Sequence, residues 1–485
     1  MKTIELHRNA IVLSPESARV IIRPFIPGSA QHIEKIVNRV LSLSEKEVRL
    51  KLKAIDHEFG NRHLNIKSLL LKNYQRGLSL IKCAEKISPA KQVLIGALFS
   101  GEYALESAAL FNPSIVPHFD QRKVAKGGLR FIMSLRATGE GHISSIEFRV
   151  GIIAPSGAIS FEPISRYVTE PEVLPNPSYL KQSFMLKLHE MGFENDCAEA
   201  VLSPFEESFT LQELNESIGT VRHHCDADCH ESKHTLDAIH WLAKCNYELS
   251  FPRTLAMSER IIFPTSPRES HGIEDARFVR FVHDDESVMY YATYTAYNGK
   301  DILPMLIETE DFSHFKIVTL NGSAIQNKGM ALFPRKVNGQ YVMLSRQDDR
   351  NILIMFSDNL HYWNKAEVLK RPSALWEAVK VGNCGSPIET EAGWLVITHG
   401  VGPMRKYCIG VILLDLEDPT KVIGQLDEPL LSPEGIEREG YVPNVVYSCG
   451  SLIHNNNLIL PYAMSDTATG IVTISLKSLL DALQS

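Results

Sequence analysis

The chain has 485 residues, of which 44% are hydrophobic, and its 57 acidic and 50 basic side chains give a formal net charge of -7. This composition supports a large buried core and excludes a disordered chain, while the mild acidity argues against general nucleic-acid binding, which needs a basic surface. No apolar run reaches the roughly 18 residues of a membrane span, and charges interrupt the first residues where a signal peptide would be apolar. We therefore expect a soluble, cytoplasmic protein that binds neither nucleic acid nor membrane.

Residues 29–109 show apolar side chains at the three- and four-residue spacing of amphipathic helices. Ser44 and Glu47 have the spacing of a capping box, and Pro89 after Ser88 suits the first turn of another helix. We expect residues 1–109 to form an N-terminal α-helical extension. Its amphipathic pattern suits a homo-oligomer interface, although plain packing explains the pattern as well.

From residue 110 onward, short β-rich runs alternate with Gly, Pro, Asn and Asp turn signals. A turn with an acidic or small residue recurs at 308–315, 356–363 and 414–419, so the repeat length is close to the roughly 40–50 residues of a β-propeller blade. The expected fold is all-β, a five-bladed β-propeller over residues 110–485. A helical insertion at about 176–250 either decorates its rim or forms one wall of a substrate cleft.

The eight cysteines are too sparse for a disulfide framework, so we expect them to be mostly reduced and buried. One short stretch gathers several soft metal ligands: His223, His224, Cys225, Cys229, His230 and His234. Four of them could bind zinc tetrahedrally, but their spacing matches no standard zinc motif. A zinc site and an incidental cluster both remain open for this stretch.

The segment 271–278 places Glu274 and Asp275 side by side, with Arg277 two residues later. Along a strand, neighbouring side chains point to opposite faces, so one carboxylate shares a face with the cation. Either carboxylate could perform acid or base chemistry if its surroundings shift its pKa, although a surface ion pair has the same pattern.

Three basic residues follow at the ends of predicted strands: Lys328, Arg346 and His399. In a propeller, strand ends from different blades converge on the central cavity. Three potential cations at one mouth suggest an anion site, whereas on an ordinary surface they would be unrelated.

Ordered motifs across the chain carry a resemblance to a known family. They include GIEDARF (272–278), NKGMALFPRKVNGQYVMLSRQ (327–347), VGNCGSPIETEAGWLVITHGV (381–401), EREGYVPNVVYSCG (437–450) and LPYAMSDTATG (460–470). Over about residues 110–475, outside the insertion, the sequence resembles glycoside hydrolase family 130. This family comprises β-mannoside phosphorylases and related β-mannosidases with a five-bladed β-propeller fold.

The resemblance implies an inverting β-mannoside phosphorylase that converts a β-mannoside and inorganic phosphate into α-mannose 1-phosphate. Asp275 matches the sole general acid, whose proton reaches the glycosidic oxygen through a mannose hydroxyl. Lys328, Arg346 and His399 match the side chains that hold phosphate. Inorganic phosphate is the co-substrate, and the resemblance implies no metal and no other cofactor.

The resemblance also indicates a substrate-binding set around the mannose. Asn112, Arg136 and Asp466 match residues that line the mannose subsite. The full expected set is Asn112, Arg136, Glu147, Glu274, Arg277, Tyr294 and Asp466.

Two other functions remain open. A hydrolytic member would use a glutamate to activate water, and Glu147 or Glu377 could be that base, although pairing with Arg149 or Lys380 would make each structural. A non-catalytic mannoside-binding propeller is the third possibility. The retention of all three candidate phosphate ligands favours phosphorolysis.

Overall fold

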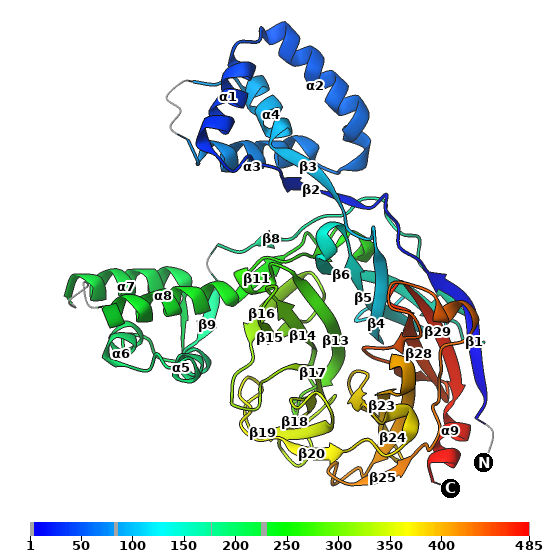
Figure 1. Ribbon diagram of the computed structural model, residues 1–485. Coiled ribbons are helices and arrows are strands. Elements are labelled where there is room, and N and C mark those ends of the chain that lie inside the picture. The colour runs from blue at the N-terminus through cyan, green and yellow to red at the C-terminus, as the bar shows by residue number, and fades with distance from the viewer. Residues whose placement is uncertain (1–3, 82–85, 176, 225–229, 485) are drawn as a thin grey trace.

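The computed structural model describes residues 4–81, 86–175, 177–224 and 230–484. The molecule is mostly β, with one group of helices near the N-terminus and a second group on the outer side of the sheets (Figure 1). No helix among the described residues is both long enough and apolar enough to cross a membrane.

Antiparallel strands after residue 109 form successive meanders of about four strands each. The strands of the first two units are β4 (Ala109–Pro117), β5 (Leu129–Thr138), β6 (Ser144–Ile153), β7 (Ile159–Phe161), β13 (Gly272–Val282), β14 (Val288–Tyr297), β15 (Ile302–Thr309) and β16 (His314–Thr319). The next two units are β17 (Lys328–Leu332), β18 (Tyr341–Arg346), β19 (Ile352–Ser357), β20 (Glu367–Lys370), β21 (Lys380–Asn383), β23 (Gly393–Val401), β24 (Tyr407–Leu414) and β25 (Val422–Gln425). The last unit is β26 (Val446–Tyr447), β28 (Asn457–Met464), β29 (Ala468–Ser475) and β1 (Leu6–Leu13).

These units follow one another around a common centre (Figure 1). Strand β13 contacts β4 and β17, β17 contacts β21, β24 contacts β26, and β28 returns to β4. Strand β23 is buried along its whole length, and its sequence GWLVITHGV is correspondingly almost continuously apolar. A strand has such a continuous apolar sequence when its sheet is covered on both faces. The hydrophobic core therefore lies between neighbouring units.

Strand β1 corrects the expected extent of the N-terminal helical part. It pairs antiparallel with β29, with Leu6 opposite Ile474, and so completes the last sheet. The helix predicted to continue toward residue 109 ends earlier, because α4 (Pro89–Leu98) is followed by β3 (Ser100–Ala104), which pairs with β2 (Val20–Pro24).

The N-terminal helices pack around their own small core and are joined to the sheets through β2 and β3 (Figure 1). They are α1 (Ala30–Leu41), α2 (Glu45–Phe59), α3 (Ile66–Leu78) and α4. The predicted capping box is confirmed, since Ser44 and Glu47 each cap the other's backbone N–H. Ser88 caps α4, with Pro89 in its first turn.

The insertion packs on the outer edge of the second unit. Its described helices are α5 (Lys181–Glu190), α6 (Asp196–Leu202), α7 (Leu211–His224) and α8 (His230–Cys245), and β11 (Tyr247–Ser250) pairs with the outer strand β16. The Lys187 ammonium donates to the Leu320 carbonyl at 3.4 Å. Because β16 is three strands away from β13, this position corresponds to a rim decoration rather than to a wall of a central cleft.

Among the described cysteines, the expectation of buried thiols is confirmed for Cys197, Cys245, Cys384, Cys408 and Cys449, all of which are free. The candidate zinc stretch depends on Cys225 and Cys229, which lie outside the described residues. Within the described part of the chain, no group of three or more His, Cys, Asp or Glu side chains is arranged to hold a metal ion.

Candidate active site

The same irregularity occurs in three innermost strands, β4, β13 and β17, each of which has a shift in its pairing register. At these shifts lie Asn112, Asp275 and Gly329, with positive φ angles of 49°, 55° and 91°. A β-bulge bends a strand and redirects a side chain that would otherwise follow the regular alternation. The bulges thereby bring Asn112 and Asp275, from different strands, to the same point near the centre of the molecule.

Asp275 lies within a compact polar cluster. Asn112 Nδ2 donates to its Oδ1 at 2.6 Å, and Arg136 Nη1 lies 3.3 Å from the same oxygen. Arg136 also pairs with Glu274 at 2.8 Å, and Lys328 Nζ approaches the other Glu274 oxygen at 3.5 Å. The structure therefore brings together five of the residues singled out from the sequence.

The surroundings of Asp275 favour its ionised form. Burial alone would raise the pKa of this carboxyl, but the positive charges of Arg136, Arg277 and Lys328 act in the opposite direction. The hydrogen bond from Asn112 adds to their effect, and the pKa of Asp275 lies below its ordinary value.

Asp466 has the opposite shift. Burial, followed by the negative charge of Asp275, raises the pKa of Asp466 to about 6, against the opposing charges of Arg136 and Arg405. Asp466 has a left-handed backbone, with a φ of 52°, in the turn between β28 and β29. Asp275 and Asp466 therefore differ in their affinity for a proton.

Gly329 allows three basic side chains to gather. Lys328 and Arg346 are directly opposite each other in the β17–β18 ladder. A Cβ at Gly329 would lie 3.2 Å from the Arg346 Cβ and 3.6 Å from Arg277 Nη1. The missing side chain thus leaves space for Arg277 and Arg346 to lie beside Lys328.

His399 does not supply a third cation, which corrects the expectation from the sequence. Burial and the charges of Arg346, Arg277 and Lys380 hold the pKa of His399 well below its ordinary value. Arg346 Nη1 lies 2.9 Å from His399 Nε2, and since a guanidinium only donates, this nitrogen accepts. His399 is therefore a neutral side chain that orients Arg346.

Tyr447 belongs to the site but was not singled out from the sequence. Arg277 Nη2 donates to the Tyr447 hydroxyl at 2.6 Å, and Arg277 is only 4% exposed. Tyr447 follows two valines in the sequence, and this apolar context is typical of a core residue. Its hydroxyl partner comes from a strand 170 residues away, which only the fold reveals.

A narrow cavity opens beside Asp275, lined in part by Asp275, Arg277, Tyr294 and Lys328. The Tyr294 hydroxyl donates to Glu269 at 2.5 Å, so Tyr294 is held rigidly in the cavity wall. Tyr294 therefore lies in the same cavity wall as Asp275, with its hydroxyl already engaged.

An aromatic pair stands near Asp466. Tyr441 is 66% exposed, and its ring centre lies 5.5 Å from that of His142. The Tyr441 N–H donates to Thr467 Oγ1 at 3.0 Å, which fixes it next to the turn that carries Asp466. Sequence reasoning did not identify this pair, because its members come from loops far apart in the chain.

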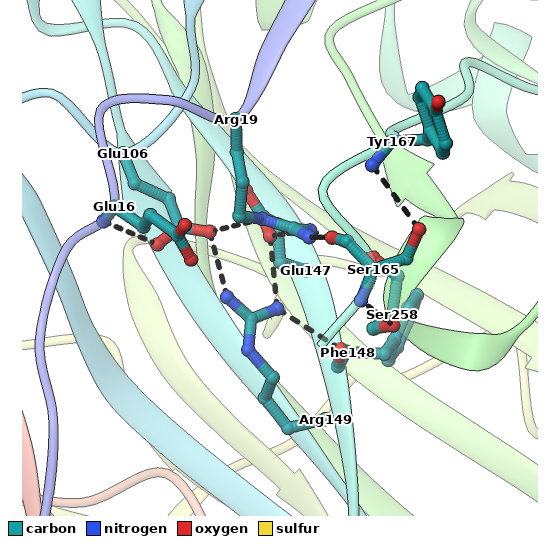
Figure 2. Close-up of polar contacts among 9 residues, drawn as sticks. All are labelled: Glu16, Arg19, Glu106, Glu147, Phe148, Arg149, Ser165, Tyr167 and Ser258. Carbon is teal, nitrogen blue, oxygen red and sulfur yellow. Dashed lines mark hydrogen bonds and ion pairs between the residues drawn. The ribbon is translucent and has the colours of Figure 1, made fainter. Parts of the chain in front are cut away.

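Glu147 does not lie with these residues, contrary to expectation. It pairs with Leu135 in the ladder, one position from Arg136, and therefore faces the other side of the sheet. Its carboxylate is fully buried, 2.6 Å from Arg19 and 3.0 Å from Arg149 (Figure 2). The charges of these arginines outweigh the effect of burial and hold the pKa of Glu147 below its ordinary value.

Glu377, the other candidate base, is also engaged. It is 1% exposed and lies 2.7 Å from Lys370 Nζ, so its partner is Lys370 rather than the expected Lys380. Ser373 donates to the same carboxylate oxygen from its N–H and its hydroxyl.

Comparison with known proteins identifies relatives of this chain. The family model Glyco_hydro_130, described as beta-1,4-mannooligosaccharide phosphorylase, matches residues 247–485. A 1,2-beta-oligomannan phosphorylase of Thermoanaerobacter sp. (strain X514) is 36% identical over 232 residues, which cover 46% of this chain and 75% of the relative. A beta-1,2-mannobiose phosphorylase of the same organism is 39% identical over 216 residues, or 43% of this chain and 68% of the relative. The chain belongs to glycoside hydrolase family 130.

Proposed function

We propose that the protein is an inverting β-mannoside phosphorylase, which cleaves a β-mannosidic bond with inorganic phosphate. One observation carries the proposal: Asp275 lines the same small cavity as Arg277 and Lys328, and Arg346 lies directly opposite Lys328. An acid and a group of cations around one cavity are what a phosphate-dependent glycoside cleavage requires. The names of the two relatives support the same reaction.

The proposed catalytic domain is a five-bladed β-propeller of residues 110–485, with the insertion at about 176–250. The closed sequence of contacts between the antiparallel units supports this fold. The bulges in β4, β13 and β17 would then be equivalent positions of successive blades, directed at the axis. The helices before residue 110 are proposed to be an extension, with β1 added to the last blade.

In the proposed reaction, phosphate is the nucleophile and needs no general base. Arg346 and Arg277 would grip its oxygens with their forked N–H groups, and Lys328 would add a point charge. A phosphate oxygen forms a bond to the anomeric carbon while the bond to the leaving oxygen breaks on the opposite face. The leaving oxygen receives the Asp275 proton through a mannose hydroxyl, and the products are α-mannose 1-phosphate and the shortened acceptor.

Phosphate binding would also prepare the acid. In the free protein the nearby cations favour ionised Asp275, which cannot donate a proton. A bound phosphate offsets the charges of Lys328 and Arg277 and so raises the pKa of Asp275. Proton uptake by the acid is thereby linked to the presence of the nucleophile.

Asn112, Arg136 and Asp466 would bind the mannose, and Tyr294 would form a wall of its subsite. Because its pKa is about 6, Asp466 is protonated below that pH and can then donate a hydrogen bond to the sugar. The Tyr441–His142 pair offers an exposed aromatic surface beside this subsite, suited to the apolar face of a neighbouring sugar. The scheme uses no metal and no cofactor other than phosphate as co-substrate.

The burial of both candidate bases favours phosphorolysis over hydrolysis. Glu147 and Glu377 are each paired with a cation inside the protein, so neither reaches a water molecule at the anomeric carbon. A binding protein without turnover would have no use for Asp275 at a bulge among three basic side chains.

The test is incubation with β-1,2- and β-1,4-linked mannobiose, with and without inorganic phosphate. We expect mannose 1-phosphate only when phosphate is present, and no product from Asp275→Asn. Asp284→Asn, which alters an exposed aspartate paired with Lys336, is the matched control and should retain activity. Free mannose formed at the same rate without phosphate would instead establish hydrolysis, and binding without any product would establish a non-catalytic protein.

A further inference from the structure

A carboxylate of the protein itself already lies between two cations at the proposed phosphate site. Asp349 Oδ1 is 3.4 Å from Arg346 Nη2, and Lys380 Nζ is 3.3 Å from both Asp349 oxygens. A carboxylate resembles part of a phosphate group in charge and in the spacing of its oxygens. The position of Asp349 therefore marks a point where Arg346 and Lys380 together hold an oxyanion.

The turn that contains Asp349 holds its backbone in a defined position. It lies in the turn after β18 with a φ of 54°, and its N–H donates to the Arg346 carbonyl at 3.3 Å. Asp348 accepts from the N–H groups of Arg350 and Asn351 and so stabilises the turn. The Asp349 side chain is 55% exposed, whereas that of Arg346 is 8% exposed. Asp349 can therefore rotate into solvent, while Arg346 stays in place.

Lys380 lies on the site side of its strand. Lys380 and Gly382 share one face of β21, because alternate residues of a strand point the same way. A Cβ at Gly382 would lie 2.4 Å from His399 Cε1 and 3.2 Å from Arg346 Cδ, so this face contacts the Arg346–His399 pair. Lys380 is therefore a further cation at the proposed phosphate site, whereas from the sequence it was expected only to pair with Glu377.

We propose that Lys380 is an additional phosphate-binding side chain and that Asp349 is an internal counter-ion that competes with phosphate for Arg346 and Lys380. This inference rests on the proposed function and extends it. When phosphate enters, Asp349 turns to solvent, which costs little for a partly exposed ion pair. When the sugar phosphate leaves, Asp349 returns to the cations, so the site binds phosphate less tightly and releases its charged product more readily.

The test is a titration of inorganic phosphate by calorimetry, together with the KM for phosphate and for the mannoside. Asp349→Asn should tighten phosphate binding by about threefold, the size expected of one partly exposed ion pair, and leave the KM for the mannoside unchanged. Asparagine also tolerates the left-handed backbone. Lys380→Met should weaken phosphate binding by a similar factor, and Asp284→Asn is the matched control. Unchanged or weaker phosphate binding by Asp349→Asn overturns the inference.

Calorimetry needs no turnover, which separates this inference from the proposed function. If the wild-type protein forms no mannose 1-phosphate but Asp349→Asn binds phosphate more tightly, the inference stands and the phosphorylase function fails. If the wild-type protein forms mannose 1-phosphate but Asp349→Asn has the same affinity for phosphate, only the inference fails. In the Lys380→Met background, Asp349→Asn should change the affinity for phosphate less than it does in the wild-type background. An equal change in both backgrounds would count against a phosphate site shared by the two side chains.

Discussion

Asn112 Nδ2 donates a 2.6 Å hydrogen bond to Asp275 Oδ1, across two strands that meet only through the fold. Both residues have a left-handed backbone at a bulge of their own strand. Asp275 is thus positioned by an amide that cannot change its charge, and the contact survives any protonation of the neighbouring carboxyl groups.

Replacing Asn112 tests this positioning. Asn112→Ala removes a hydrogen bond to a charged group, so we expect kcat to fall by roughly 10- to 100-fold, in line with about 1.5–3 kcal/mol for such a bond. The bond favours ionised Asp275, so its loss raises the pKa of Asp275 and moves the alkaline limb of the pH profile upward. Asn338→Ala, at a left-handed turn where the side chain donates to the Glu417 carbonyl, is the control. An unshifted pH profile would contradict this role.

Lys328 separates phosphate binding from sugar binding. Lys328→Ala should raise the KM for phosphate by about tenfold, or about 1.4 kcal/mol, because one charge of the cation group is lost. The KM for the mannoside should change much less, since Arg136 still holds Glu274. Initial rates at varied phosphate and varied mannoside measure both constants. Equal increases in the two would place Lys328 at the sugar instead.

Asp466 gives the site a pH-dependent stability. Its pKa of about 6 in the folded protein exceeds that of the unfolded chain, so the stability it contributes is present at low pH and is lost as pH rises through about 6. Asp466→Asn removes the buried charge and should therefore raise the Tm at about pH 8 more than at about pH 5. Thermal unfolding at the two pH values measures the difference. The same change in Tm at both would show that the charge of Asp466 costs no stability.

Arg19 anchors the chain between β1 and β2 to the sheet. Its guanidinium bridges the buried carboxylates of Glu106 and Glu147 at 2.7 Å and 2.6 Å (Figure 2). Arg19→Met leaves two buried acids with Arg149 alone, so we expect a loss of about 3–5 kcal/mol in the free energy of unfolding. Urea denaturation measures this loss. The exposed Arg166→Met is the control, and a loss for Arg19→Met no larger than the control's would contradict the account.

The sequence predicted those features that depend on local patterns. Ser44 and Glu47 marked a helix start because a capping box involves only neighbouring residues. The pattern around Asp275 is equally local, but it left Glu274 and Asp275 open as candidates, and the proposed acid role of Asp275 comes from the family resemblance of the motif. Strand β1 was missed, since its partner β29 lies at the other end of the chain and nothing in LHRNAIVL records that pairing.

Two predictions about the site from the sequence were wrong, each for a physical reason. Glu147 was expected at the substrate, but the face it occupies depends on the register with β5, which the sequence does not reveal. His399 was expected to be a cation, but its charge depends on burial and on Arg346, which lies 53 residues away. Both properties arise from contacts between strands that are distant in sequence.

The pairing of β1 with β29 also sets the order in which the molecule can assemble. Strand β1 is synthesised long before β29, so it has no partner until β29 has been made, because Leu6 lies opposite Ile474. Contacts of such long sequence separation form slowly, since a large loop must close before they contribute. The sheets from β4 to β25 can form during synthesis, while the pairing of β1 must wait for β29, so a slow folding phase should depend on β1.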